Sequence, residues 1–204
     1  MAITNTTKLE AVNTMLSAVG SSPVSTLSGQ QTADAIVAQN ILDEVTRDVL
    51  SQGWDFNHER KISLAPDGDS QVILGTNVAR IDTTHGYNTD YDIVQRGNRL
   101  YDRKSHSYTI GETLTCDVIY FMEFDETPEA ARRYMMIRAA RIFQDRMVGS
   151  GNHHTYNMTD EIKSLTDLKA LESATGDHNI FQNSDVYRVI DRPTALRNST
   201  LETL

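Results

Sequence analysis

Four stretches of the chain carry apolar side chains three or four residues apart, which is the spacing of one face of an α-helix. In the second stretch, for example, Leu42, Val45 and Val49 recur in this way. The pattern predicts helices over about residues 7–19, 32–52, 127–148 and 159–174. In the fourth stretch the apolar residues recur every three positions. This spacing is shorter than a helical turn of about 3.6 residues, so the apolar side chains spread around the helix. We therefore expect the fourth helix to contact two neighbours.

Residues suited to helix ends flank these stretches. Thr7 and Glu10 have the spacing of a capping box, in which each side chain bonds the backbone N–H of the other residue. Thr127 and Thr159 are the expected N-caps of the third and fourth helices. Gly53 follows the second helix, and glycine commonly ends a helix.

The core of the second and third helices can also be predicted. Ile36 is expected beside the core residues of the second helix. The third helix should bury a stripe made of Tyr134, Met136, Ile137, Ala140, Phe143 and Met147. Its other faces hold Arg132, Arg133, Arg138, Arg141 and Arg146. These arginines could bind phosphate or the carboxylates of a partner, but we favour a solvated face on which their stems cover apolar surface.

Between about residues 60 and 124, apolar and polar side chains alternate, which is the two-residue period of a β-strand. The clearest strand is residues 114–122, whose polarity falls toward its end, so it is expected to enter the interior there. Gly97-Asn98 separates two short apolar runs at hairpin spacing. Further short strands are expected at residues 62–64, 72–74 and 78–81. The sequence thus predicts an α+β fold, with a bundle of about four helices, a small antiparallel β-sheet and an extended C-terminal arm.

The arm begins after Gly176, where no clear period is left. Its apolar patches are too short for a helix or a core of their own, so we expect them to dock on another chain. Residues 1–176 would form a single α+β domain and residues 177–204 the arm. Arginines in the arm would pair with carboxylates of the neighbour, a geometry that suits Arg better than Lys. The candidate contact residues are Ile180, Phe181, Tyr187, Arg188 and Arg192.

Charge and cysteine content exclude several classes of protein. The 204 residues include 19 basic and 28 acidic ones, which gives a net charge of −9. Such a chain is unsuited to wrapping nucleic acid, because that affinity comes from neutralising phosphates. Cys116 is the single cysteine and forms no internal disulfide. We expect no signal peptide and no membrane anchor, since the longest uncharged stretch, residues 11–33, is rich in polar side chains.

Residues suited to catalysis lie in patterns that structure explains. Cys116 lies in mid-strand, where a buried structural thiol is expected. His153-His154 cannot both face one metal from a helix or strand and are expected in a solvated loop. Asp67 and Asp69 lie in a turn, and residues 123–126 precede a helix start that favours negative charge. No phosphate-binding glycine motif occurs. We therefore expect no catalytic residue, no cofactor and no metal site.

Several segments, in this order, resemble one protein family. They are Gly20-Ser21-Ser22-Pro23-Val24-Ser25-Thr26-Leu27, Ala33-Asp34-Ala35, Ser51-Gln52-Gly53-Trp54-Asp55-Phe56-Asn57, Leu100-Tyr101-Asp102-Arg103 and Asp125-Glu126-Thr127-Pro128-Glu129. Over roughly residues 8–148 the chain resembles the tail tubular protein A family of T7-like short-tailed bacteriophages. Pro23, Trp54 and Phe56 are candidate structural anchors within these segments, the last two at the junction of helix and sheet.

The resemblance implies a structural adaptor of the virion tail, usually a dodecameric ring. Such a ring joins the portal protein to the nozzle made by tail tubular protein B, and genomic DNA passes through its lumen without specific binding. Tail fibre protein is a further partner that the resemblance implies. The family supplies no catalytic residues. A net charge of −9 suits a conduit whose wall must not hold the phosphate backbone. We expect assembly in the bacterial cytoplasm.

Two other functions remain open from the sequence. A phage-encoded hydrolase of host envelope polysaccharide would need two carboxyl groups about 5 to 10 Å apart in a cleft. A host-side binding module would never enter virions. The first alternative depends on the arrangement of the carboxylates, which the sequence leaves open.

Overall fold

The computed structural model describes residues 4–29, 31–149 and 151–175. The chain divides into two compact units, Met1–Lys169 and Ala170–Leu204. The packing described below belongs to the first unit, and the described part of the second unit is the end of one helix. The predicted arm lies outside the described residues.

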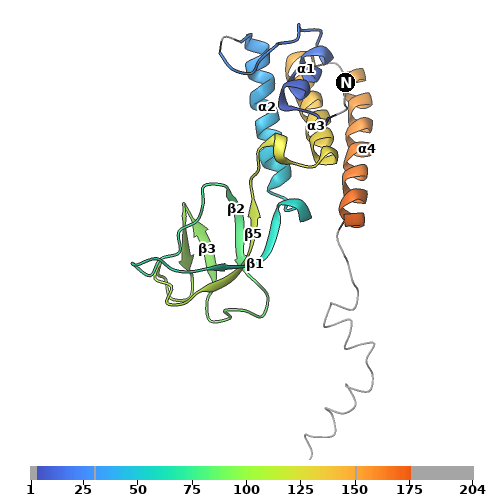
Figure 1. Ribbon diagram of the computed structural model, residues 1–204. Helices are drawn as coiled ribbons and strands as arrows, with labels where there is room; N and C mark the ends of the chain where they lie inside the picture. Colours follow the sequence, from blue (N-terminus) through green and yellow to red (C-terminus); the bar gives the residue numbers. More distant parts are fainter. Residues whose placement is uncertain (1–3, 30, 150, 176–204) are drawn as a thin grey trace, which may run out of the picture. The chain divides into compact units, whose positions relative to one another are not determined.

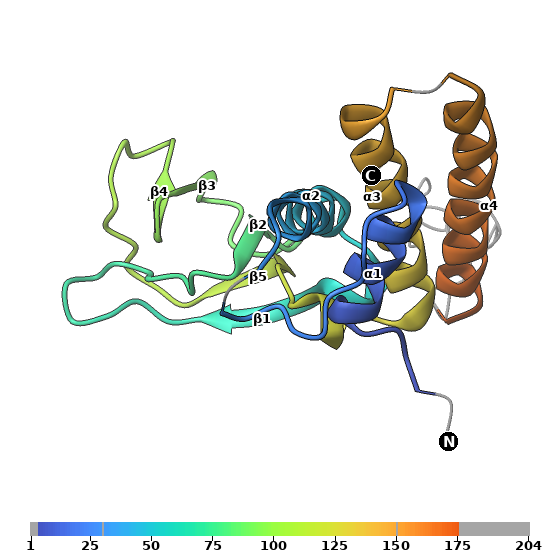
Figure 2. The same ribbon diagram turned by 90° about the horizontal axis from the view of Figure 1, so that it is seen from above.

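Four α-helices lie within the described residues (Figure 1): α1 (Lys8–Ala18), α2 (Ala33–Leu50), α3 (Glu129–Met147) and α4 (Gly151–Thr175). Figure 2 shows α3 between α2 and α4. Buried apolar side chains of α1, α2 and α3 form one core, which also includes Leu168 of α4. The predicted helical bundle is therefore present.

The start of α1 follows the prediction and the start of α3 does not. Thr7 Oγ1 accepts a hydrogen bond from the Glu10 amide at 3.2 Å, and Glu10 Oε2 accepts one from the Thr7 amide at 2.8 Å. This confirms the capping box. The N-cap of α3 is Pro128, and the Thr127 hydroxyl donates to the carbonyl of Phe124 instead of capping the helix.

The prediction for the start of α4 is wrong. The helix begins at Gly151, so His153-His154 belong to a helix and not to a loop. Thr159 lies inside α4, where its hydroxyl donates to the carbonyl of Thr155 at 3.2 Å. A threonine can bond a carbonyl one turn back as well as cap a helix, and residues 151–158 carry no apolar period that would have revealed the first two turns.

The core stripe of α3 differs in phase from the predicted one. Ala131, Met135, Ala139 and Phe143 are fully buried at four-residue spacing, whereas Met147 is 45% exposed. Small side chains on this ridge allow α3 to approach α1 and α2 closely. Of the predicted stripe, Tyr134 and Phe143 are buried and Met136, Ile137 and Ala140 are half-buried. Ile36 on α2 was also wrongly predicted, because it is 47% exposed.

The strands in the described residues are β1 (His58–Leu64), β2 (Val78–Thr83), β3 (Ile93–Arg96), β4 (Arg99–Asp102) and β5 (Leu114–Tyr120). β5 is the central strand of a three-stranded antiparallel sheet, between β1 and β2. β3 and β4 form the predicted hairpin across Gly97-Asn98. The predicted strand at residues 72–74 is reduced to a bridge between Ile73 and Arg99. The α+β fold class is confirmed.

The apolar side chains form two separate cores, one within the helices and one within the sheet and hairpin. At the end of β5, Val118 and Ile119 are both buried although they point to opposite faces of the sheet. The strand therefore enters the interior there, as expected. Two short connections join the cores, each with a 3-10 turn: η1 (Asp55–Asn57) and η2 (Phe124–Glu126).

Asn57 bonds both sides of this junction with one buried side chain, which is 2% exposed. Its Nδ2 donates to the carbonyl of Leu50 at 2.9 Å and to the carbonyl of Tyr120 at 2.7 Å. Its Oδ1 accepts from the Trp54 amide at 2.8 Å, and Trp54 Nε1 donates to the carbonyl of Val49 at 2.9 Å. The end of α2 is thereby fixed to the end of β5.

Gly53 is required where α2 turns into this junction. Its φ of +79° lies in the left-handed region, and a Cβ there would lie 2.4 Å from Ile119 Cδ1. Gly20 has a similar φ of +77° but open space around it. The two glycines therefore separate the effect of backbone strain from that of crowding.

We expect Gly53→Ala to lower the free energy of unfolding by about 2–4 kcal/mol, from strain in the left-handed region plus overpacking against Ile119. Gly20→Ala should cost only about 1–2 kcal/mol, because it adds strain alone. Urea denaturation followed by circular dichroism measures both. Equal losses would show that the close approach to Ile119 has no energetic consequence.

Candidate functional site

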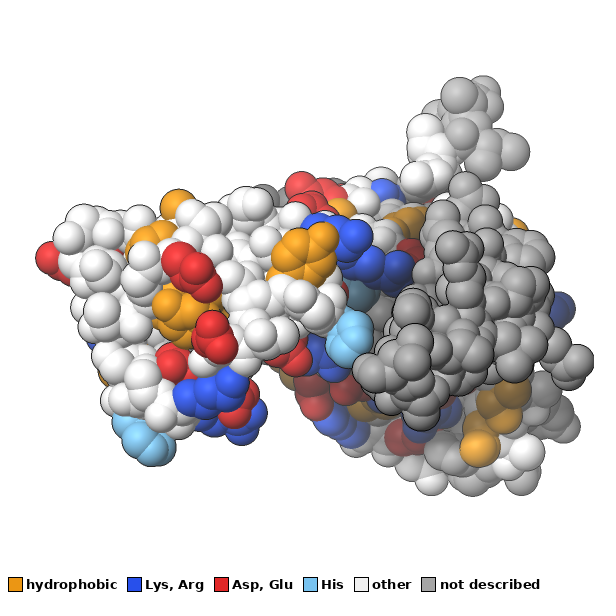
Figure 3. Space-filling view, turned by 90° about the horizontal axis from the view of Figure 1, so that it is seen from below, with side chains coloured by type: hydrophobic (Ala, Val, Ile, Leu, Met, Phe, Trp, Pro, Cys, Tyr) orange, Lys and Arg blue, Asp and Glu red, His pale blue; other side chains and the backbone are white. Residues whose placement is uncertain are grey.

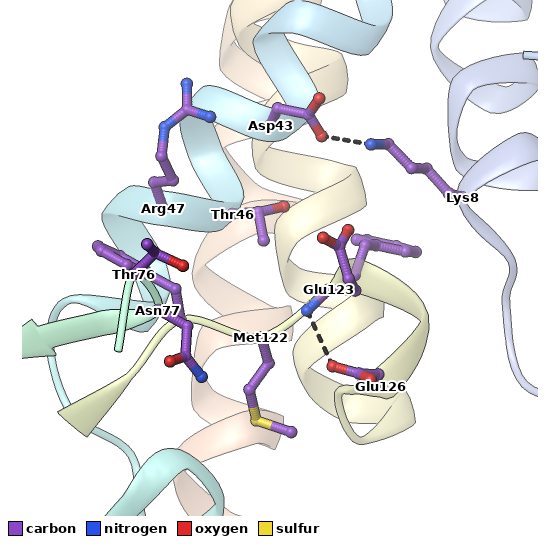
Figure 4. A pocket seen from close by; sticks show the side chains of 11 residues that line it. Lys8, Asp43, Thr46, Arg47, Thr76, Asn77, Met122, Glu123 and Glu126 are labelled. Carbon is purple, nitrogen blue, oxygen red and sulfur yellow. Dashed lines mark hydrogen bonds and ion pairs between the residues drawn. The ribbon is translucent and has the colours of Figure 1, made fainter. Parts of the chain in front are cut away.

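A cleft lies where the helical bundle meets the sheet, and Figure 4 shows its side chains. α1 and α2 contribute to one wall, and the loop before β2 and the link from β5 to η2 contribute to the other. The cleft has a volume of about 460 Å³.

Three charged groups of the cleft, those of Lys8, Asp43 and Glu126, are bonded within the chain. Lys8 Nζ lies 2.6 Å from Asp43 Oδ1, and Glu126 Oε2 accepts from the Glu123 amide at 3.2 Å. The Thr46 hydroxyl donates to a carbonyl of its own helix. The residues lining this cleft include no Cys, Ser or His. The cleft can offer polar contacts to another chain.

Asp67 and Asp125, two of the carboxylates in the turn and helix-start segments, bond to the backbone. Asp67 Oδ1 accepts from the amides of Asp69 and Gln71, each at 2.9 Å. Asp125 Oδ1 accepts from the Lys8 amide at 2.8 Å. Bonds of this kind fix a turn and a helix end, which are the structural roles expected for these side chains. Within the described residues, no three His, Cys, Asp or Glu side chains are grouped so that they could hold a metal ion.

Cys116 lies fully buried in the middle of β5. Burial, with the charge of Asp117 beside it, raises the pKa of the Cys116 thiol to about 11. The thiolate is the nucleophilic form of cysteine, and at neutral pH this side chain stays protonated. Its environment is that of a structural thiol.

Arginines of α3 connect three helices. Arg138 Nη2 lies 2.6 Å from Asp48 Oδ2 on α2, and Arg138 Nε lies 3.7 Å from Glu161 Oε1 on α4. Arg141 bonds the same Glu161 carboxylate, and this hydrogen bond raises the pKa of Arg141. The expected solvated face is therefore wrong for these two arginines, because carboxylates of neighbouring helices engage them. Such partly exposed pairs add little stability and mainly orient the helices.

Arg132 departs furthest from the expected solvated position, since it is 7% exposed. Its Nε donates to the carbonyl of Thr127 at 2.7 Å and its Nη1 to the carbonyl of Thr6 at 2.9 Å. Its Nη2 donates to the carbonyl of Asp125. One guanidinium thus fixes the segment before α1 against the segment before α3.

Asp102 fixes the hairpin in a similar way. The side chain is 2% exposed. Its Oδ1 accepts from the amides of Asp92 and Lys104 at 3.0 and 3.1 Å, and its Oδ2 accepts from the amide of Ser105 at 3.0 Å. Hydrogen bonds from the Ser105 side chain and from these amides outweigh burial and hold the pKa of Asp102 well below its ordinary value.

The candidate anchors occupy different environments. Pro23 is exposed, in a loop that Asn13 holds by two hydrogen bonds to the backbone of Val24, at 2.8 and 2.9 Å. Trp54 and Phe56 are half-buried and pack against the helical core at the junction. The arm residues Ile180, Phe181, Tyr187, Arg188 and Arg192 lie outside the described residues.

Three residues whose side chains connect segments of the fold by hydrogen bonds were not identified from the sequence: Asn57, Asp102 and Arg132. Asn57 and Asp102 lie inside segments that carry the family resemblance, and that signal could have identified them. Arg132 has no such signal, because only the tertiary packing distinguishes it from the exposed Arg133.

We expect Asp102→Asn to lower the free energy of unfolding by about 1–3 kcal/mol at pH 7, because an amide replaces a buried carboxylate that accepts several hydrogen bonds. A depressed pKa stabilises the fold above the ordinary value of 3.8, and this stabilisation is lost as pH falls below it. The difference between variant and wild type should therefore shrink toward pH 2 in urea titrations. The exposed Asp90→Asn is the control, and a difference independent of pH would contradict the assignment.

A family model described as tail tubular protein matches residues 9–178. The match includes both cores and the junction between them. No curated protein matches the chain significantly. Among the described residues, no helix has both the length and the apolar character needed to cross a membrane. Because the family model covers most of its length, the chain belongs to the tail tubular protein family and is a structural component of a phage tail.

Proposed function

We propose that the chain is the adaptor of the tail, tail tubular protein A, which forms a ring between the portal protein and the nozzle protein, tail tubular protein B. The observation that carries this proposal is the family match over residues 9–178. The ordered segments that resemble the adaptor family add support. Of these segments, Ser51–Asn57 and Asp125–Glu129 lie at the joints between the two cores.

The chemistry of the described side chains supports a structural role and no enzymatic one. Asp67 and Asp125 accept hydrogen bonds from backbone amides, and the thiol of Cys116 is buried and protonated. Several arginines of α3 bond carboxylates or carbonyls of their own chain. A scaffold that must keep its shape under load is expected to use its polar groups in this way.

The proposed ring is dodecameric and forms part of the conduit for DNA ejection. A net charge of −9 supports a lumen through which DNA passes without specific binding. Tail fibre protein is a further proposed partner at the nozzle side. We propose assembly in the host cytoplasm and a final location in the virion tail. Residues 1–176 would be the adaptor domain and residues 177–204 the arm that contacts a neighbouring subunit or the portal.

We expect the full chain, mixed with the portal and nozzle proteins of its phage, to form a ring between them in electron micrographs. In the control, the portal protein is left out. If assembly follows an ordered pathway that starts at the portal, the chain should then fail to recruit the nozzle protein in the same position. A chain that binds neither protein, and that is missing from purified virions by mass spectrometry, would contradict the adaptor function.

We expect truncation after Gly176 to leave the circular dichroism spectrum of the body nearly unchanged and to abolish ring assembly. The reason is that large apolar side chains of the arm would each contribute about 1.5–3 kcal/mol when they are buried against another chain. In the full chain, replacing Arg188 and Arg192 with Ala should weaken assembly, whereas Arg197→Ala in the same arm is the control. A truncated chain that assembles with normal affinity, or that fails to fold, would contradict this role.

A further inference from the structure

The β3–β4 hairpin and the loop that follows it form a basic region in an acidic chain. Residues 93–108, here named the basic hairpin, contain four Lys and Arg residues and one acidic residue, the buried Asp102. The whole chain has a net charge of −9. Figure 3 shows basic side chains at one corner of the molecular surface, with acidic side chains beside them. The position of these cations is defined by the bonds of Asp102, which fix the hairpin backbone.

Two arginines of the basic hairpin are held in place without a carboxylate partner. The guanidinium carbon of Arg96 lies 3.6 Å from the ring centroid of Tyr101, and that of Arg99 lies 4.9 Å from the ring centroid of Tyr108. The two rings pack edge to face at 5.0 Å. Arg99 also donates to the Gln71 side chain, but among the described residues no carboxylate lies within 4.0 Å of either guanidinium. Stacking leaves N–H groups at the edge of each guanidinium for an anion.

A second segment has the opposite charge. Residues 123–129, here named the acidic turn, contain four exposed carboxylates and no basic residue: Glu123, Asp125, Glu126 and Glu129. Asp125, Glu126 and Glu129 accept hydrogen bonds from backbone amides and a threonine hydroxyl, such as the Thr6 amide on Glu129 at 2.7 Å. In the described part of the chain, no Lys or Arg forms an ion pair with any of the four.

The two segments lie apart within one copy. Figures 1 and 2 place the acidic turn at the bundle, between β5 and α3, and the basic hairpin at the outer end of the sheet region. Arg96 and Arg99 and the four carboxylates of the acidic turn are exposed and lack an ion pair within the described residues, whereas Arg103 of the hairpin pairs with Asp92 at 2.7 Å. Because the two surfaces differ, a contact between them in two copies would be head to tail, and a repeated head-to-tail contact forms a ring when the rotation from copy to copy closes.

We propose that the basic hairpin of one copy binds the acidic turn of the next copy. This inference rests on the proposed ring and names the surfaces that join its subunits. Arg96 and Arg99 would each meet a carboxylate of the neighbour, in the two-pronged geometry that arginine forms with carboxylates. Complementary charge would also fix the register of the subunits and prevent contacts between like surfaces.

Nucleic acid fits the basic hairpin less well. Arginine side chains cover the tyrosine faces on which bases would stack, and two unpaired arginines offer few of the phosphate contacts that hold duplex DNA. The acidic turn, in contrast, supplies the anionic groups within the same chain. A second copy is therefore the favoured occupant.

Charge reversal on each surface tests the proposal. One variant carries Arg96→Glu with Arg99→Glu, and a second carries Glu123→Lys with Glu126→Lys. Each alone should yield roughly tenfold fewer rings on the portal protein than wild type, a change that corresponds to about 1.4 kcal/mol. An equal mixture of the two should restore rings, because each reversed surface then meets a reversed partner. The chain that carries all four substitutions should also assemble.

Arg60→Glu, an exposed position on the same sheet, is the matched control and should assemble like wild type. Circular dichroism verifies that every variant is folded. Normal assembly of either reversed variant, or failure of their mixture to form rings, would overturn the inference. Rings formed by the wild type would in that case still support the adaptor function. Absence of rings from wild type would instead contradict the adaptor function. If the arginine variant assembled normally but lost a mobility shift with duplex DNA, the basic hairpin would be a nucleic-acid contact and the proposal would be wrong.

Discussion

The side-chain amide of Asn57 holds the helical core and the sheet core in one body. Each core is closed by apolar contacts of its own, and only the short connections through η1 and η2 join them. Apolar contacts are non-directional, whereas the bonds of Asn57 to the carbonyls of Leu50 and Tyr120 have defined directions. A buried amide left without partners costs about 1–3 kcal/mol, so alternative arrangements of the two cores are disfavoured. The cleft and the acidic turn are positioned by this joint.

The same solution recurs at other joints of the first unit. Arg132 collects carbonyls from the segments before α1 and α3, and Asp102 collects amides around the hairpin. In each case a buried polar side chain satisfies backbone groups that no helix or strand can satisfy. Asn57 and Asp102 belong to segments that resemble the tail tubular protein A family. Those segments therefore lie at joints of the fold, and they contain no catalytic pattern.

An element could be predicted from the sequence where the residues that determine it lie close together along the chain. The capping box of α1 and the β3–β4 hairpin depend on residues a few positions apart, and both were predicted correctly. The buried stripe of α3 depends on packing against α1 and α2, and the burial of Arg132 brings it against the distant Thr6 as well as its own segment, so both predictions failed. The start of α4 failed because its first turns lack an apolar face. The charge of the basic hairpin was readable from the sequence, but the stacking of Arg96 on Tyr101 was not.

Charges therefore divide into two groups with different consequences. Those of α2, α3 and α4 neutralise one another across helices, as in the contacts of Arg138 with Asp48 and Glu161, and orient the bundle. Arg96 and Arg99 of the basic hairpin and the four carboxylates of the acidic turn have no such partner among the described residues, whereas Arg103 pairs with Asp92. Exposed ion pairs each contribute about 0–1 kcal/mol, and salt weakens them. In the proposed ring they would select the register of the subunits, and the free energy of association would have to come mainly from apolar burial.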